Sequence, residues 1–192
     1  MMNTEDFIQE EFERISKDFI AVKSLAPAIS QVADICINAV KNGNKIMFCG
    51  NGGSAADAQH LAAELVGRYK INRKAIASIA LTTDTSILTA VANDYGYDVV
   101  FSRQVEALGK KADVLIGIST SGNSPNIIKA FEKAMELGVV TVALTGQTGG
   151  KMLPIADYTI NVPSDMTNLI QTMHIAVGHL LCDLIEKSVI DE

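Results

Sequence analysis

Apolar residues recur at helical spacing over the first 42 positions of the chain. Residues 3–23 and 26–42 each carry an apolar stripe, and Gly43 ends the second one. We therefore predict two long helices before the first strand. Their stripes are wide enough to pack on a partner subunit as well as on the chain's own sheet.

The hydrophobic pattern changes after residue 44, where short apolar runs alternate with helical stretches. Five runs predict strands, at residues 45–49, 75–81, 114–118, 139–144 and 158–162. Helices are expected at residues 54–69, 85–108 with a break near 93–96, 125–137, 149–156 and 166–188. This alternation is typical of βαβ units, so we predict an α/β protein with a parallel sheet covered on both faces.

No repeat or linker divides the chain. We predict a single domain over residues 1–192, with residues 1–43 as a helical extension used in oligomerisation and residues 44–192 as the α/β core. The composition is 48% hydrophobic and 20% charged, which is typical of a globular protein. A net charge of −6 and the lack of a basic run disfavour nucleic-acid binding.

No membrane span is expected, since no apolar run approaches about 18 residues. No signal peptide is expected either, since residues 1–13 are acidic and amphipathic and lack a basic start and an apolar stretch. The three cysteines are Cys36, Cys49 and Cys182, and their spacing matches no zinc or redox motif. Each stands among apolar residues. We predict reduced core thiols and, from them, a cytoplasmic protein.

A glycine-rich loop follows the first predicted strand. Its sequence, Gly50-Asn51-Gly52-Gly53-Ser54, opens a helix whose free N–H groups attract an anion. We discount a dinucleotide, because no acidic residue ends the next strand, and a Walker A loop, because no Lys-Ser/Thr pair follows. A tight turn without a ligand is the alternative.

A second polar loop follows the third predicted strand. It contains Ser119, Thr120, Ser121 and Ser124, of which Ser124 suits a helix N-cap and Pro125 the first helical position. The other hydroxyls have no such structural role. Hydroxyls and N–H groups together suit a phosphate, and both loops end strands at the same edge of the sheet, so we predict a phosphate site there.

Two helices carry polar pairs on otherwise apolar surfaces. His60 and Glu64 are four residues apart and share a face. On the last helix, Gln171 and His179 lie about 80° apart around the axis, whereas His174 lies about 140° from His179 and is more typical of a packing residue. Each pair suits a metal or an acid–base role. Surface pairing and a hydrogen-bonded core histidine are the alternatives.

The sequence Asn93-Asp94-Tyr95-Gly96 is a turn signal inside a helical run. It indicates either a plain helix break or a place where Asp94 approaches a ligand.

Together these motifs resemble the phosphoheptose isomerases, a family of sugar isomerase (SIS) domain proteins. The resemblance covers nearly the whole chain and implies a doubly wound, flavodoxin-like five-stranded sheet with an N-terminal two-helix extension. The serine loop is common to SIS domains, whereas the two polar pairs are more specific. The matching strings are Gly50 to Ser54, His60-x-x-x-Glu64-Leu-x-Gly67-Arg68, Ala92-Asn93-Asp94, Gly117-Ile-Ser119-Thr-Ser121-Gly-Asn-Ser124 and Gln171-x-x-His174-x-x-x-x-His179.

The resemblance implies conversion of D-sedoheptulose 7-phosphate to D-glycero-D-manno-heptose 7-phosphate, the entry to nucleotide-activated heptose for surface polysaccharide such as lipopolysaccharide. It implies a homotetramer with active sites between subunits and one zinc ion per subunit. The implied zinc ligands are His60, Glu64, Gln171 and His179. The implied substrate contacts are Asn51, Gly52, Gly53, Ser54, Glu64, Asn93, Asp94, Ser119, Thr120, Ser121, Ser124 and Gln171.

The chemistry fits these residues. Moving a carbonyl between neighbouring carbons through an enediol needs a base near the carbons and an acid near the oxygens. Glu64 and His179 are the expected catalytic pair. Zinc would polarise the oxygens, and two imidazoles favour it over magnesium.

A second interpretation comes from a SIS relative that binds the replication initiator DnaA and is not known as an enzyme. Residues 88–94 and 181–185 are as similar to that protein as to the isomerases. Its pattern lacks a carboxylate at position 64 and a histidine at position 179. Because Glu64 and His179 are both present here, the isomerase is favoured. A phosphosugar-sensing regulator would need a DNA-binding domain, for which the chain has no room.

Overall fold

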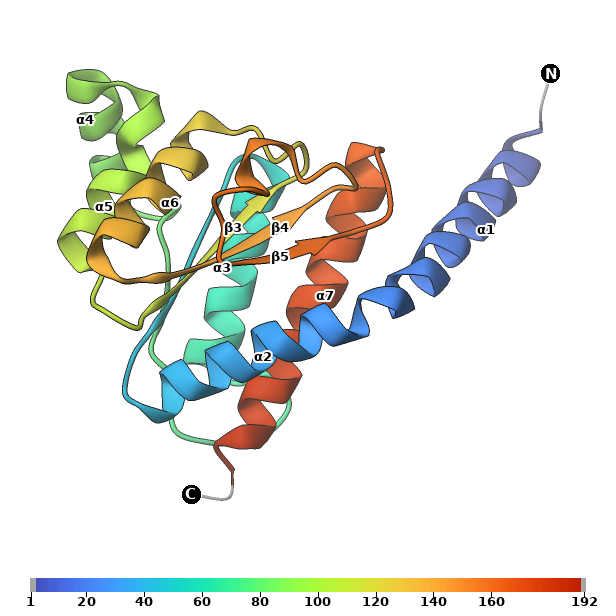
Figure 1. Ribbon diagram of the computed structural model, residues 1–192. Coiled ribbons are helices and arrows are strands. Elements are labelled where there is room, and N and C mark those ends of the chain that lie inside the picture. The colour runs from blue at the N-terminus through green and yellow to red at the C-terminus, as the bar shows by residue number, and fades with distance from the viewer. Residues whose placement is uncertain (1–2, 191–192) are drawn as a thin grey trace.

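The computed structural model describes residues 3–190 and contains one five-stranded parallel sheet (Figure 1). The strand order is β2-β1-β3-β4-β5, which confirms the predicted flavodoxin-like topology with its switch point between β1 and β3. The strands are β1 Ile46–Gly50, β2 Ser78–Ala80, β3 Val114–Ser119, β4 Val140–Thr145 and β5 Tyr158–Asn161.

Alternate residues of the strands face two separate cores. Ile46 and Phe48 lie in one core with apolar residues of α2 (Ala26–Lys41), α3 (Gly53–Val66) and α7 (Thr167–Ser188). Met47 and Cys49 lie in the other core, with α5 (Val100–Leu108) and α6 (Pro125–Leu137). A sheet buried on both faces explains why its strands are continuous apolar runs.

Helix α1 (Thr4–Val22) differs from α2, α3 and α7, because none of its residues is buried. In Figure 1 it extends away from the sheet. Phe7, Phe12 and Ile20 are 52, 67 and 61% exposed. By length and composition alone the continuous segment Thr4–Lys41 is apolar enough to cross a membrane, which the sequence did not lead us to expect. The buried face of α2 packs on the sheet instead.

The helix predicted over residues 149–156 is wrong. Only a short 3-10 turn, Gly150–Met152, forms there. Gly149 and Gly150 both have a positive φ, at 69° and 54°, so the backbone leaves the right-handed helical region. The apolar spacing that suggested a helix comes from a loop packed on the core, where Met152 is fully buried.

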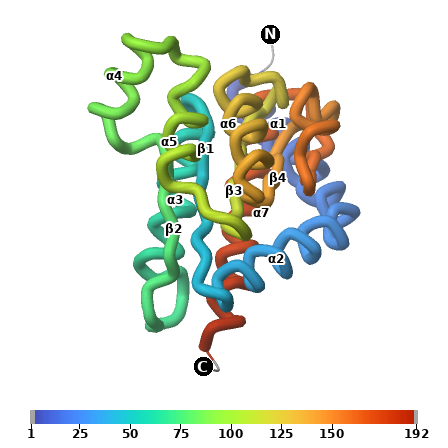
Figure 2. The backbone as a smooth tube through the Cα atoms, turned by 60° about the vertical axis from the view of Figure 1, so that its left-hand side comes forward, coloured from blue at the N-terminus to red at the C-terminus, as the bar shows by residue number. Residues whose placement is uncertain are grey.

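The predicted break in the helical run over 85–108 is confirmed. Helix α4 (Thr85–Tyr95) ends at Gly96, whose φ is 93°, and a 3-10 turn, Tyr97–Val99, leads into α5. None of the residues of α4 is buried, and the helix projects at the far end of the molecule from the end of α7 (Figures 1 and 2).

The cysteines are free and buried, as predicted. Burial raises the pKa of the Cys36 and Cys49 thiols to about 12, so both stay protonated and unreactive.

Candidate functional site

A close contact between α3 and α7 positions the predicted histidines. Gly178 lies directly against Leu61, and a Cβ atom at Gly178 would come within 2.6 Å of the Leu61 side chain. His60 directly precedes Leu61, and His179 directly follows Gly178. Their Nε2 atoms are consequently 3.1 Å apart, with ring centroids separated by 5.0 Å.

Glu64 completes a three-residue cluster. Its Oε1 lies 3.0 Å from Nε2 of His60, one helical turn away on α3. The ligand atoms of His60, Glu64 and His179 all lie within 4.8 Å of one another. Two nitrogens that bind one tetrahedral zinc at about 2.0–2.1 Å are about 3.3 Å apart, close to the separation seen here. The donor set of two imidazoles and a carboxylate therefore fits zinc.

Asp57 belongs to this neighbourhood, and sequence reasoning missed it. It lies three residues before His60 on α3, and its buried Oδ2 has no hydrogen-bond partner among the described residues. Burial raises the pKa of the Asp57 carboxyl, although His60 and His179 act to lower it. The spacing Asp57-x-x-His60 is the signal that would have identified it.

The first predicted loop leads from β1 into α3. Gly50 has no room for a side chain, since a Cβ atom would lie 2.5 Å from the Ser54 carbonyl oxygen. Gly52 has a φ of 56°, which favours glycine. Asn51 is fixed by a reciprocal amide pair with Asn126, at 2.8 and 3.0 Å. Ser54 is only 3% exposed, so little of it is open to a ligand.

The second predicted loop leads from β3 into α6. The Ser119 and Ser124 hydroxyls are 2.9 Å apart and bond to each other. Ser124 is at the N-cap position as predicted, but its hydroxyl makes no capping bond. Ser121 accepts a hydrogen bond from the Asn123 N–H, while Thr120 is half-buried. Both loops thus place hydroxyls and backbone groups at the carboxyl edge of the sheet, where ligands of open α/β sheets bind.

With this geometry established, known proteins identify the family. An SIS domain model matches residues 9–146. Phosphoheptose isomerase of Akkermansia muciniphila is 61% identical over 184 residues, covering 96% of this chain and 97% of that relative. The chain belongs to the phosphoheptose isomerase family. The Helicobacter pylori member is 56% identical over 187 residues, covering 95% of this chain and 96% of its own.

Solved structures of this family have the same fold. Phosphoheptose isomerase GmhA from Neisseria gonorrhoeae superposes with a TM-score of 0.91 at 44% identity, covering 96% of this chain and 100% of that one. The structure from Francisella tularensis has a TM-score of 0.93 at 39% identity, with coverages of 97 and 100%. As a phosphoheptose isomerase family member, the chain is an isomerase.

Gln171 lies at the other end of the helix pair from the two histidines. Its side chain packs on the first loop, where a Cβ atom at Gly53 would come within 2.6 Å of Gln171 Nε2. Gln171 and His179 are eight residues apart, or about 12 Å along the axis of α7. Within one chain, three of the four predicted metal ligands meet, and Gln171 contacts the loop instead.

Asn93 and Asp94 lie near the end of α4 and are exposed. The Asn93 amide donates a hydrogen bond to Asp94 at 2.9 Å. Nearby, the Tyr97 hydroxyl lies 3.5 Å from Asn51 Oδ1, which links this segment to the first loop. A role for the Asn93–Asp94 pair in substrate binding stays a prediction.

His174 lies between Gln171 and His179 on α7 but faces the core. It is 1% exposed, and neither ring nitrogen has a hydrogen-bond partner of good geometry within residues 3–190. Burial lowers its pKa to about 4, partly offset by the nearby Thr145 backbone. The imidazole is therefore neutral near pH 7 and packs, as predicted from its angular position.

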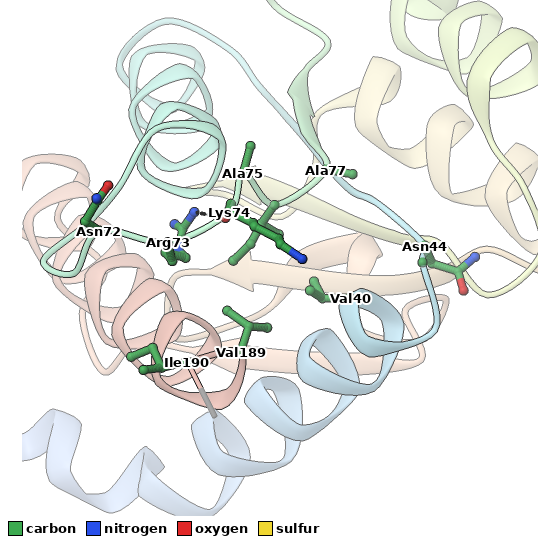
Figure 3. Close-up of a pocket in the computed structure, with 11 residues that line it drawn as sticks. Val40, Asn44, Asn72, Arg73, Lys74, Ala75, Ala77, Val189 and Ile190 are labelled. Carbon is green, nitrogen blue, oxygen red and sulfur yellow. Dashed lines mark hydrogen bonds between the residues drawn. The ribbon is translucent and has the colours of Figure 1, made fainter. Parts of the chain in front are cut away.

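A cavity of about 470 Å³ lies away from this cluster, beside the ends of α2 and α7 (Figure 3). Its walls include Val40, Ile76, Val189 and Ile190, with Arg73 and Lys74 from the segment that follows α3. None of the predicted site residues lines it. The candidate site is therefore the helix pair with its two loops.

Proposed function

We propose that this chain converts D-sedoheptulose 7-phosphate to D-glycero-D-manno-heptose 7-phosphate, the first step towards nucleotide-activated heptose. The observation that carries the proposal is the meeting of His60, Glu64 and His179 from two helices. The relatives' names supply the substrate class. The DnaA-binding alternative gains no support from this cluster, which a purely binding protein does not need.

Phosphate binding is assigned to the two loops. Backbone N–H groups at the start of α3 and the hydroxyls of Ser119, Thr120, Ser121 and Ser124 suit a phosphate without a lysine or arginine. The further substrate contacts that we propose are Asn51, Gly52, Gly53, Asn93, Asp94, Gln171 and Glu64. Ser54 is also predicted as a contact, but its burial leaves only a small part of it to reach the substrate. The Gly53 end of α3 is about 10 Å from His60 along the axis, so a phosphate bound there leaves the sugar chain to reach the cluster.

Glu64 and His179 are the proposed acid–base pair. The Glu64 carboxylate removes a proton from C1 of the ketose, and the electron pair forms the C1–C2 double bond of the enediol. His179 supplies a proton to the C2 oxygen and receives one from the C1 oxygen. Glu64 then returns its proton to C2, which leaves the carbonyl at C1.

We propose one zinc ion per subunit, held by His60, Glu64, Gln171 and His179. Bound zinc would polarise the substrate's carbonyl and hydroxyl oxygens. The support for it is the donor set described above. Gln171 of the same chain lies about 12 Å from His179 along α7, so the Gln171 that adds a weak amide oxygen would come from a neighbouring subunit. Such a site keeps a ligand position for substrate.

We further propose a homotetramer in the cytoplasm with active sites between subunits. A groove of about 600 Å³ runs between α1, α2 and α7 and is lined by Phe19, Val22, Ile29, Leu180 and Leu184. Together with the exposed apolar side chains of α1, it forms the kind of apolar surface that marks a protein–protein contact. The first half of α1 is rich in acidic residues, so it suits contact with protein better than with lipid.

Incubation of the zinc-loaded protein with D-sedoheptulose 7-phosphate tests the activity. The aldose should appear at a rate proportional to enzyme, and the Glu64→Gln variant should form it far more slowly. Failure to form any aldose with zinc supplied would overturn the proposal. DnaA capture by the same preparation would then favour the binding protein.

A further inference from the structure

Tyr69 lies against His179, next to the proposed metal site. The two rings stack with centroids 5.5 Å apart and an interplanar angle of 25°. Tyr69 comes from the irregular segment between α3 and β2, which has no helix or strand to fix it. The Tyr69 ring can restrain the His179 imidazole only if the backbone of its own segment is fixed.

A buried carboxylate supplies that restraint. Glu186, on α7 and 0% exposed, accepts hydrogen bonds from three successive backbone N–H groups: Tyr69 at 2.9 Å, Lys70 at 2.7 Å and Ile71 at 3.0 Å. Burial acts to raise the pKa of Glu186, but these bonds and Arg73 outweigh it and lower the pKa. The carboxylate is therefore charged near pH 7, and charge-assisted bonds are the stronger kind.

Arg73 connects the same carboxylate to the end of α3. Its Nε lies 3.2 Å from Glu186 Oε1, and its guanidinium donates to the carbonyl oxygens of Glu64 at 2.9 Å and Leu65 at 2.9 Å. It also donates to the Lys74 carbonyl, the bond drawn in Figure 3. One buried ion pair thus restrains both the backbone of Glu64 and the ring that covers His179.

We infer that Tyr69 is a positioning residue for His179, held in place by the Glu186–Arg73 pair. The inference rests on the proposed function, because it concerns the orientation of the proposed acid. The Tyr69 ring limits the tilt of the His179 imidazole, so that Nε2 stays directed at His60 and at the space between the two imidazoles and Glu64. Residues that orient a metal-binding or catalytic histidine typically change activity or metal affinity 10–100-fold when removed.

The test compares Tyr69→Leu, which removes the ring, with Tyr69→Phe, which keeps it. Tyr158→Leu is the matched control, since Tyr158 is also half-buried but begins β5, away from the cluster. For each protein we would measure kcat, KM, zinc affinity by chelator competition, and the NMR signals of isotopically labelled histidine. The His60→Gln and His179→Gln variants assign the signals, and His174 serves as the internal reference.

Tyr69→Leu should lower kcat about 10-fold or more with KM little changed, weaken zinc binding, and shift the His179 ring proton downfield as the shielding ring is lost. Tyr69→Phe and Tyr158→Leu should stay near wild type in kcat. An unmoved His179 signal in Tyr69→Leu, or an equal loss of kcat in Tyr69→Phe or Tyr158→Leu, would overturn the inference. Should the wild type lack isomerase activity, the proposed function fails, while the NMR and zinc measurements still decide the positioning role.

Discussion

The two ends of the α3–α7 helix pair differ in the groups they present. At the Gly53–Gln171 end there are glycines, an amide and the hydroxyls of the neighbouring serine loop. At the other end, about 10 Å away along α3, are two imidazoles and a carboxylate, with Asp57 one turn from His60. The first set suits holding an anion and the second suits moving protons. In the function that we propose, the helix pair thus separates substrate binding from proton transfer.

The largest effect is expected at the charged end. A His60→Ala/His179→Ala double variant removes both imidazoles, so it should lose the bound zinc and all measurable turnover. Metal analysis of freshly purified protein should find about one zinc per wild-type chain and almost none in the variant. A wild type without bound metal, whose activity added zinc does not raise, would contradict the metal assignment.

Glu64→Gln comes next in expected size. It keeps the side-chain shape but removes the charge, so turnover should fall about 10²–10⁴-fold while the substrate dissociation constant changes little. Single-turnover rates and an independent binding measurement separate the two quantities. Glu132→Gln makes the same change on an exposed position of α6 and should have no effect. Near-normal turnover in Glu64→Gln would show that another group moves the proton.

Ser119→Ala tests the opposite end. Hydrogen bonds to charged groups contribute about 1.5–3 kcal/mol, so losing this hydroxyl should weaken substrate binding about 10-fold or more and leave kcat nearly unchanged. Ser102→Ala is the control, because Ser102 is also buried and bonds a backbone carbonyl on the far face of the sheet. If Ser119→Ala lowers kcat and leaves binding intact, the division between the two ends is wrong.

His174 lies between the ends and should matter for stability more than for activity. Its pKa is lowered from an unfolded value of 6.5 to about 4, so the folded state resists protonation. This contribution to stability is complete above about pH 6.5 and is lost as the pH falls towards 4, by about 3 kcal/mol in total.

Denaturant unfolding of the wild type and His174→Gln at several pH values checks this expectation. The variant should lose less unfolding free energy between pH 7 and pH 4, and its turnover should fall less than that of Glu64→Gln. Glu186 and Asp113, whose pKa values are also lowered, are common to both proteins and cancel in the comparison. Equal pH dependence in the two proteins would contradict a buried neutral imidazole.

The sequence predicted β1, β3 and β4 well because each is a largely apolar run buried on both faces, whereas the edge strands β2 and β5 are shorter than predicted and partly exposed. It also predicted that the two loops share an edge, since that follows from parallel strands alone. The 149–156 helix failed because apolar spacing does not reveal two glycines with positive φ. Asp57 lies three residues before His60, a spacing that places both residues on one face of α3.

Tyr69 and Glu186 show where sequence reasoning ends. They are 117 residues apart, and their bond joins an irregular segment to a helix that was predicted as merely apolar. Helix and strand periodicity relate only residues that are close in the sequence, so they do not predict a contact between Tyr69 and Glu186. The contact of Gln171 with Gly53 is equally hard to predict. It depends on the position of α7 relative to α3 along the helix axes, which the residue pattern of neither helix determines.

The absent side chain at Gly178 sets the spacing of the two imidazoles. A Cβ atom there would lie 2.6 Å from both terminal carbons of the buried Leu61 side chain, so a larger residue requires Leu61 to change its conformation or α7 to move away from α3. A movement of α7 would increase the distance between the Nε2 atoms of His60 and His179 without replacing either residue. Zinc, with its short nitrogen bonds, would be disfavoured relative to a larger ion. In the metal site that we propose, the size of the residue at position 178 would therefore influence metal preference from the hydrophobic side of the helices.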